Sequence, residues 1–156
     1  MCIVYIDMDG VLVDLAAEIK KRSQDCMNIF DSDNFDNIPG IFRDSPPIDG
    51  AVEAVKKMAG SGKYDLYIAT TVPWKNPTSL AEKQQWIQYY FGDLFFKRVI
   101  STHRKDLLLG DFLIDDRDAN GAGSFQGELL RFGWNYELKK FNDYPDWNSI
   151  LQKFML

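Results

Sequence analysis

The sequence predicts an α/β fold in which helices cover a doubly wound, mostly parallel sheet. Three observations support this prediction. Short continuous runs of apolar β-branched and aromatic residues recur along the chain, as is typical of strands buried on both faces. Segments with apolar residues at helical spacing separate these runs. The 156 residues, 46% of them hydrophobic, suffice for one compact domain (residues 1–156) but not for two.

The first half of the chain supplies two strands and two helices. Residues 2–6 form the first apolar run, which ends in an acidic turn, and residues 12–19 follow with apolar side chains at helical spacing. Residues 28–47 are rich in Asp, Asn, Pro and Gly, which indicates a loop-rich insertion with room for one short helix. A helix at residues 51–59 and a buried strand at residues 66–69 come next.

The second half continues the alternation. Ser79 and Glu82 have the spacing of a capping box and predict the start of a helix that ends near Gly92. The remaining elements are strands at residues 98–100, 112–114 and 129–132 and a terminal helix at residues 147–154. Because ligands of such sheets bind beyond the carboxyl ends of the strands, the polar residues found there are the candidates for a functional site.

Composition disfavours several classes of function. The net charge of −5 argues against non-specific binding to nucleic acid. Cys2 and Cys26 are the only cysteines, and they form neither a disulfide framework nor a zinc-ligand spacing. The N-terminus lacks the features of a signal peptide, and no apolar run approaches the length of a membrane span. We therefore expect a soluble, cytoplasmic protein with no nucleic-acid polymer and no membrane among its partners.

Polar side chains stand at or just after the ends of four predicted strands. They are Asp7, Asp9, Thr70, Thr71, Lys105, Asp115 and Asp116. Four carboxylates that converge on one edge of a sheet repel one another unless a cation lies among them. Oxygen ligands with few nitrogens or thiolates favour Mg²⁺, which leaves coordination positions for a substrate phosphate.

This set of side chains is suited to phosphoryl transfer. A carboxylate beside Mg²⁺ can attack phosphorus and divide one difficult displacement into two easier ones. Thr70 can donate a hydrogen bond to a phosphoryl oxygen, and Lys105 supplies positive charge. Taken singly, each piece has an ordinary alternative, such as a turn for the acidic pair or a solvated basic stretch around Lys105. Their occurrence together, each at a strand end, favours the functional interpretation.

The same residues resemble the motifs of the haloacid dehalogenase (HAD) superfamily of phosphohydrolases. Residues 7–11 (DMDGV) resemble the first motif, and the strand that ends in Thr70 resembles the second. Lys105 matches the third motif, and residues 113–117 (LIDDR) match the fourth. The resemblance implies a HAD-like Rossmannoid core and a phosphatase that depends on Mg²⁺.

Further stretches resemble one branch of this superfamily, the 5'(3')-deoxyribonucleotidases. They are DMDGVLVD at residues 7–14, FRDSPPIDGA at 42–51, EKQQWIQYYF at 82–91, GDFLIDDR at 110–117 and the pair Asp146-Trp147. The similarity touches nearly the whole chain, except the insertion and the loop at residues 119–127. It implies that the substrate is a small phosphate ester, namely a deoxynucleoside or nucleoside monophosphate.

The resemblance also implies the roles of the two leading carboxylates. Asp7 would attack phosphorus and bind Mg²⁺. Asp9 would offer the metal only its backbone carbonyl, so that its side chain is free to act as general acid and base. This division is physically reasonable, because a carboxylate bound to Mg²⁺ stays ionised while one that points away can carry a proton for the leaving group.

The other motif residues would bind the metal or the phosphate. Asp116 matches the direct metal ligand of this branch, and Asp115 matches a neighbour that orients waters or Lys105. Thr70 and Lys105 would hold the phosphoryl group, with Thr71 nearby. The site residues implied by the resemblance are thus all drawn from the four strand ends.

Residues 15–45 fall where this branch inserts a small helical cap over the active site. A cap excludes water and contacts the leaving group. Because the segment is shorter here than in the animal nucleotidases, their substrate-stacking aromatic residues cannot all be matched. Phe30, Phe35 and Phe42 are candidates, Phe42 being the best placed, and Trp74 could reach the pocket from the loop after the second strand. For each of them the alternative is a packing role.

Three alternatives to a nucleotidase stay open or are disfavoured by the sequence. A signalling receiver domain also uses acidic residues, a hydroxyl and a lysine around Mg²⁺, but there the acidic pair comes first in the chain. A non-catalytic phosphate- or nucleotide-binding relative is disfavoured by the complete set of motif residues. A phosphatase for another ester, such as a sugar phosphate, uses the same chemistry and is the alternative that the motifs do not exclude.

Overall fold

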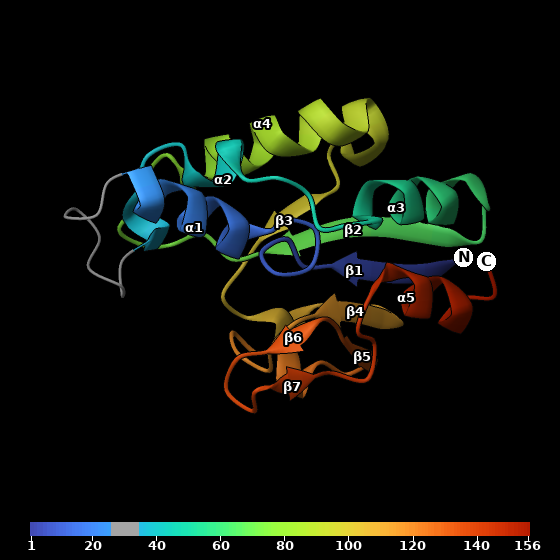
Figure 1. The fold of residues 1–156 in the computed structure, drawn as a ribbon. Coiled ribbons are helices and arrows are strands. Elements are labelled where there is room, and N and C mark those ends of the chain that lie inside the picture. The colour runs from blue at the N-terminus through green and yellow to red at the C-terminus, as the bar shows by residue number, and fades with distance from the viewer. Residues whose placement is uncertain (26–34) are drawn as a thin grey trace.

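A computed structural model describes residues 1–25 and 35–156. It contains a five-stranded sheet with the order β3-β2-β1-β4-β5, in which every neighbouring pair is parallel (Figure 1). The strands are β1 (Cys2–Ile6), β2 (Tyr64–Thr70), β3 (Val99–Ser101), β4 (Phe112–Asp115) and β5 (Glu128–Arg131). The predicted α/β fold with a mostly parallel sheet is confirmed.

The strand order reverses at β1, which creates a crevice for a ligand. The chain runs from β1 outward through β2 to β3, and then returns to place β4 and β5 on the other side of β1. Ile6 lies opposite both Ile68 and Ile114, so the carboxyl ends of three adjacent strands are level with one another. Ligands of doubly wound sheets bind at this kind of reversal.

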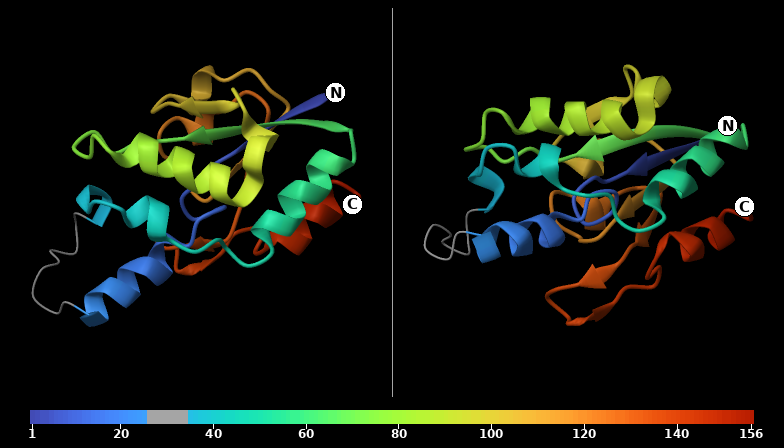
Figure 2. Two further views of the ribbon diagram at one scale, coloured as in Figure 1. Left: turned by 90° about the horizontal axis from the view of Figure 1, so that it is seen from above. Right: turned by 45° about the horizontal axis from the view of Figure 1, so that its top comes forward.

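Helices pack mainly on one face of the sheet. The helices of the described residues are α1 (Leu15–Asp25), α2 (Ile41–Asp44), α3 (Ala51–Gly60), α4 (Ser79–Phe91) and α5 (Trp147–Lys153), with short 3-10 turns η1 (Phe35–Asn37) and η2 (Gly92–Phe95). Side chains of α3, α4 and α5 form the large apolar core with Val4 and Ile6 of β1. Figure 2 shows α3 and α5 next to each other at the end of the molecule where the termini lie. None of the described helices is both long and apolar enough to cross a membrane.

The opposite face carries a smaller cluster around Tyr5, Leu113 and Phe125. It is covered by connecting segments that contain the 3-10 turns η3 (Lys105–Leu107) and η4 (Ala122–Ser124). Helical spacing was not detectable in these connections because single 3-10 turns are too short to show it. One face of the sheet is therefore covered by α-helices and the other by connecting segments with single 3-10 turns.

Several element boundaries differ from the predicted ones. The first helix begins at Leu15, because Leu12 belongs to the tight turn after β1, where its amide donates to Met8 O. The predicted capping box at the start of α4 is wrong. Thr78 is the N-cap and makes no side-chain capping bond, while the Glu82 carboxylate binds other backbone groups, described below.

A short hairpin escaped prediction. It consists of β6 (Trp134–Asn135) and β7 (Lys140–Phe141), which pair in antiparallel fashion after β5. Strands of two residues carry too little alternation to be detected in a sequence. The hairpin contacts the acidic end of the sheet through Asn142, whose amide donates to Asp116 O at 3.2 Å.

The insertion between β1 and α3 forms α1, η1 and α2. Figure 1 shows α1 and α2 beyond the carboxyl ends of the strands, at the end of the molecule opposite to both termini. Arg22 of α1 binds Asp44 of α2 at 2.9 Å and so connects the two limbs of the insertion. That these residues act as a cap stays a prediction.

Candidate active site

The turn after β1 brings the first motif against the fourth. Asp7 N donates to Ile114 O at 2.9 Å, which fixes Asp7 beside the end of β4. Gly10 has a φ of 76°, and a Cβ atom at this position would lie 2.5 Å from Asp116 Oδ2. A side chain is thus excluded at Gly10 both by its left-handed backbone and by the close approach of Asp116.

Three carboxylates meet at this point. Asp7, Asp115 and Asp116 each place one oxygen so that all three oxygens lie within 4.8 Å of one another. Burial, and then the charge of Asp7, raise the pKa of Asp115 to about 6 and the pKa of Asp116 to about 8. Carboxylates that lie this close and have raised pKa values repel one another when they are all ionised. A small divalent cation such as Mg²⁺ would offset this repulsion, so the cluster fits such an ion.

Lys105 lies between two of these carboxylates. Its Nζ donates to Asp7 Oδ1 at 2.7 Å and to Asp115 Oδ2 at 2.6 Å, and the residue is only 2% exposed. Burial by itself lowers the pKa of Lys105, but the charges of the two carboxylates outweigh this effect and raise the pKa. Lys105 is therefore charged at neutral pH.

The glycine-containing loop before β5 holds Lys105 in this position. Lys105 N donates to Asn120 O at 2.8 Å. A Cβ atom on Gly121, whose φ is 83°, would lie 2.2 Å from Asp106 Oδ1 and 3.0 Å from Lys105 N. The loop is thus packed closely against η3 and has a definite conformation.

Asp9 faces a buried lysine that the sequence analysis missed. Lys83 Nζ donates to Asp9 Oδ2 at 2.6 Å, to Thr70 Oγ1 at 2.9 Å and to Thr71 O at 2.6 Å. These acceptors use all three ammonium hydrogens. Asp9 Oδ1 is buried without a hydrogen-bond partner among the described residues. Burial raises the pKa of Asp9, although the charge of Lys83 opposes this shift.

A signal for Lys83 was present in the sequence. Lys83 shares a face of α4 with Ser79, Trp86 and Ile87, at spacings of three and four residues, and all four are buried. A lysine on the apolar face of a helix is rarely buried unless it is paired. The predicted site residues all stand at or just after strand ends, whereas Lys83 comes from a helix.

The two threonines at the end of β2 occupy different positions. Thr70 is fully buried, and its hydroxyl accepts the hydrogen bond from Lys83. Thr71 borders the pocket, and its Oγ1 donates to Thr102 O at 3.0 Å. The structure therefore places Thr71, and not Thr70, on the pocket wall.

A small pocket opens beyond the ends of the central strands. Its lining consists of Asp7, Asp9, Thr71, Lys105, Asp115, Arg117, Ala119 and Asn120. Five of these residues belong to the predicted set, whereas Arg117 and Asn120 were not predicted as site residues. The pocket lies at the reversal of strand order, as expected for this fold.

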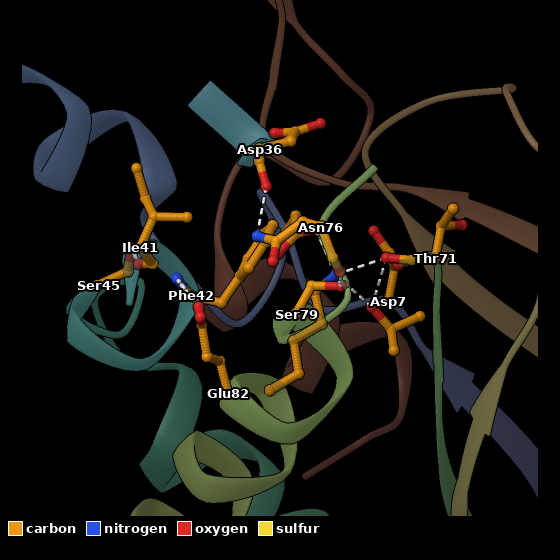
Figure 3. Close-up of polar contacts among 12 residues, drawn as sticks. Asp7, Asp36, Ile41, Phe42, Ser45, Thr71, Asn76, Ser79 and Glu82 are labelled. Carbon is orange, nitrogen blue, oxygen red and sulfur yellow. Dashed lines mark hydrogen bonds and ion pairs between the residues drawn. The ribbon is translucent and has the colours of Figure 1, made fainter. Parts of the chain in front are cut away.

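One limb of the insertion is fixed to α4 and to the loop before it, because side chains there make hydrogen bonds to main-chain atoms of the limb (Figure 3). The bonds run from Asn76 Nδ2 to Asp36 O at 2.6 Å, from Gly40 N to Glu82 Oε1 at 2.8 Å, from Phe42 N to Glu82 Oε2 at 3.3 Å and from Trp86 Nε1 to Ser45 O at 2.8 Å. We call residues 35–45 the anchored limb. Its position relative to the pocket is set by three side chains outside it.

The predicted aromatic contacts to substrate have different outcomes. Phe42 is fully buried, and Lys83 Nζ lies 4.5 Å from the centroid of its ring, so it packs in the interior and cannot stack on a substrate. Phe35 is half-buried. Phe30 lies outside the described residues. Trp74 is 92% exposed, so the alternative of a packing role is wrong for this residue.

Comparison with solved structures identifies the class of fold. The chain matches a haloacid dehalogenase-like family hydrolase from Streptococcus pneumoniae with a TM-score of 0.65 and 13% identity over 99% of this chain and 98% of that one. It matches a HAD hydrolase from Bacillus subtilis, solved with bound magnesium, with a TM-score of 0.62 and 12% identity over 99% of each chain. At this level of identity the matches establish the HAD-like fold.

Sequence comparison identifies the family. Residues 25–153 match the family described as 5' nucleotidase, deoxy (pyrimidine), cytosolic type C protein. A protein of Vibrio phage KVP40 named as a 5'(3')-deoxyribonucleotidase is 41% identical over 149 residues, which make up 96% of this chain and 82% of the relative. The human mitochondrial 5'(3')-deoxyribonucleotidase is 37% identical over 152 residues, with 76% of this chain and 64% of the relative covered.

The chain belongs to the 5' nucleotidase, deoxy (pyrimidine), cytosolic type C family. The resemblance to the deoxyribonucleotidase branch of the HAD superfamily is thereby confirmed, as is the predicted enzyme class of phosphoric monoester hydrolases. The receiver-domain alternative is wrong. The chain covers 40% of the human cytosolic relative, to which it is 39% identical over 80 residues.

Proposed function

We propose that this chain is a Mg²⁺-dependent 5'(3')-deoxyribonucleotidase, which hydrolyses the phosphate ester of deoxynucleoside monophosphates through an aspartyl-phosphate. The observation that carries the proposal is the meeting of Asp7, Asp115 and Asp116 within 4.8 Å, beside the ammonium of Lys105. The names of the relatives support the nucleotide as substrate. The same geometry would serve a phosphatase for a sugar phosphate.

The residues present fit a magnesium ion. The carboxylates of Asp7 and Asp116 and the backbone carbonyl of Asp9 would hold it, with Asp115 orienting Lys105 at 2.6 Å. When bound, the ion neutralises negative charge that develops on the phosphoryl oxygens. The raised pKa of Asp116, about 8, supports this proposal, because it reflects burial first and then the charges of Asp7 and Asp115, both of which a bound cation would offset.

The protein's own residues divide the reaction into two steps. In the first, an oxygen of Asp7 bonds to phosphorus, the ester bond breaks, and the leaving oxygen takes the proton of Asp9. In the second, Asp9 removes a proton from water, whose oxygen attacks the same phosphorus and releases inorganic phosphate and free Asp7. The raised pKa of Asp9 and its partner-free Oδ1 suit a group that carries a proton between these steps.

Neighbouring residues would position the reacting groups. Lys83 holds Asp9 Oδ2, so that Oδ1 is the oxygen left to exchange the proton. Lys105 borders the pocket and would bind a phosphoryl oxygen, as would Thr71 once its hydroxyl turns away from Thr102 O. Thr70 would position Lys83, whose hydrogen bond it accepts. Residues 15–45 would form the cap, and Trp74, an exposed aromatic residue on the loop after β2, would stack on the base.

The proposal is tested by phosphate release from 4-nitrophenyl phosphate with and without Mg²⁺. We expect activity that requires the metal and that is lost in Asp7→Asn, whose far-ultraviolet circular dichroism stays that of the parent. An undiminished rate in this variant would remove Asp7 as the nucleophile. Comparison of deoxynucleoside monophosphates with sugar phosphates decides the substrate class, because a clear preference for a sugar phosphate contradicts the nucleotidase assignment.

A further inference from the structure

Arg117 borders the pocket, and its side chain has fewer protein contacts than the two lysines of the site. Lys83 donates all three ammonium hydrogens to protein oxygens, and Lys105 donates two. The Arg117 side chain is 60% exposed, and its one ion pair among the described residues is a long one, with Nε 3.7 Å from Asp116 Oδ1. The guanidinium group thus has donors that are free to bind a ligand.

When a phosphate dianion binds, the site has more negative than positive charge, so a further cation would be favourable. Four carboxylates, those of Asp7, Asp9, Asp115 and Asp116, face the two ammonium groups of Lys83 and Lys105. A bound Mg²⁺ would bring this set to neutrality, and a phosphate monoester dianion would then add two uncompensated charges. Arg117 is the remaining cationic residue of the pocket lining.

The backbone of Arg117 places the side chain at the rim. Arg117 N donates to Asp115 Oδ1 at 3.1 Å, so the start of the side chain is fixed beside the acidic cluster while the guanidinium is exposed. A planar guanidinium can donate two parallel hydrogen bonds to two oxygens of one phosphoryl group, a fixed geometry that the ammonium group of a lysine does not have.

We propose that Arg117 binds the phosphoryl group of the substrate and makes the enzyme selective for phosphomonoester dianions over phosphodiester monoanions. The proposal rests on the proposed phosphatase function and deepens it. Two of the three non-bridging oxygens of a monoester can pair with the guanidinium fork while the third faces Lys105. A diester has one charge fewer and one more oxygen bonded to carbon, so it benefits less from this contact.

The test compares Arg117→Gln and Arg117→Lys with a matched control, Arg131→Gln. Arg131 is also a partly exposed arginine near a strand end, but it binds Asp118 at 2.8 Å and lies outside the pocket lining. At saturating Mg²⁺, we expect Arg117→Gln to raise the KM for 4-nitrophenyl phosphate and the dissociation constant of inorganic phosphate by about tenfold, as for the loss of a charge-assisted hydrogen bond. We expect kcat to change by less than about threefold, Arg117→Lys to recover part of the loss, and the control to behave as the parent.

A second measurement separates phosphate binding from an indirect effect through Asp116. If Arg117 only stabilised the charge of Asp116, the glutamine variant would change the affinity for Mg²⁺ and leave phosphate binding at saturating metal unaltered, which would overturn the proposal. An unchanged preference for 4-nitrophenyl phosphate over its methyl diester would also overturn it. Calorimetric titration of inorganic phosphate does not depend on turnover, so it tests Arg117 even if the nucleotidase assignment fails.

Discussion

The acidic end of the site and the anchored limb are held by different kinds of contact. At the acidic end, side chain meets side chain, as in the bonds of Lys105 to Asp7 and Asp115. In the anchored limb, Asn76, Glu82 and Trp86 bind main-chain atoms of the insertion. The acidic end therefore depends on the identity of its own residues, while the limb could keep its place with other side chains at many of its positions.

This difference explains why the chemistry was easier to predict than the substrate contacts. A nucleophile and its metal ligands restrict the residue type at each position, whereas main-chain contacts leave the sequence of the insertion less constrained. We therefore expect small changes at the acidic end to affect the reaction, and changes to the anchored limb to affect mainly stability and substrate affinity.

Gly10→Ala tests how closely the acidic end is fitted. The new Cβ atom would lie 2.5 Å from Asp116 Oδ2, so we expect Asp116 to move, Mg²⁺ affinity to fall and kcat/KM to drop by about 100-fold, as for other small displacements in active sites. Steady-state kinetics over a Mg²⁺ titration measure both effects. Gly60→Ala is the control, because nothing lies within 4 Å of its added Cβ atom. Equal rates in both variants would contradict the close fit.

Lys83→Met tests whether Asp9 needs its buried partner. Without Lys83 Nζ, the bond to Asp9 Oδ2 at 2.6 Å is lost and the carboxyl group can rotate. We expect kcat to fall by about 10- to 100-fold, as for impaired acid–base catalysis, and to fall further for an alkyl phosphate than for 4-nitrophenyl phosphate, whose leaving group needs less protonation. An equal loss with both substrates indicates that Lys83 acts on the fold and not on Asp9. Lys56→Met, in an exposed position of α3, is the control.

Glu82→Gln tests how much the hydrogen bonds to the anchored limb contribute to stability and to the reaction. The carboxylate accepts hydrogen bonds from Gly40 N and Phe42 N, and an amide must turn a donor toward one of them. We expect the free energy of unfolding to fall by about 1–3 kcal/mol, the cost of an unsatisfied buried group. We expect kcat for 4-nitrophenyl phosphate to stay within about threefold, since the acidic end is untouched. Urea denaturation and the same assay measure the two quantities, and a loss of kcat without a loss of stability would reverse the assignment.

The outcome of prediction from sequence follows the same division. The sequence predicts Asp7, Asp115, Asp116 and Lys105 because each stands at or just after the end of a strand, and the structure brings them together. Lys83 was missed because it lies on a helix, although its spacing from Trp86 marked it as buried. Phe42 was a candidate for contact with the substrate, and the structure gives it the alternative, a packing role. The burial of an aromatic residue in an insertion depends on tertiary contacts that no local pattern contains.

Stability as a function of pH tests the crowding of the acidic end in the metal-free protein. The pKa of Asp116 is about 8 in the folded chain and near 4 in an unfolded one, so the folded chain retains a proton that the unfolded chain has lost between these values. Stability from this group is therefore present at low pH and lost as the pH rises from about 4 to about 8.

We expect the metal-free parent to lose about 2 kcal/mol of stability relative to Asp116→Asn between pH 5 and pH 8.5, because one pKa unit corresponds to 1.36 kcal/mol and coupling to the other carboxylates reduces the full effect. Saturating Mg²⁺ should remove this loss. Urea denaturation with chelator and with Mg²⁺ measures it. If the two proteins lose stability with pH in parallel in the absence of metal, the pKa of Asp116 is not raised in the folded chain.

Trp74→Ala carries the smallest expected effect and tests the substrate side directly. The ring is 92% exposed on the loop after β2, three residues from Thr71, and the same loop binds the anchored limb through Asn76. Loss of an exposed stacking residue should raise the KM for a deoxynucleoside monophosphate by about fivefold, while the KM for a sugar phosphate and the thermal stability stay unchanged. Quenching of indole fluorescence by the nucleotide gives an independent readout, for which Trp134→Phe is the control. Equal effects on both substrates would mean that the base does not stack on Trp74.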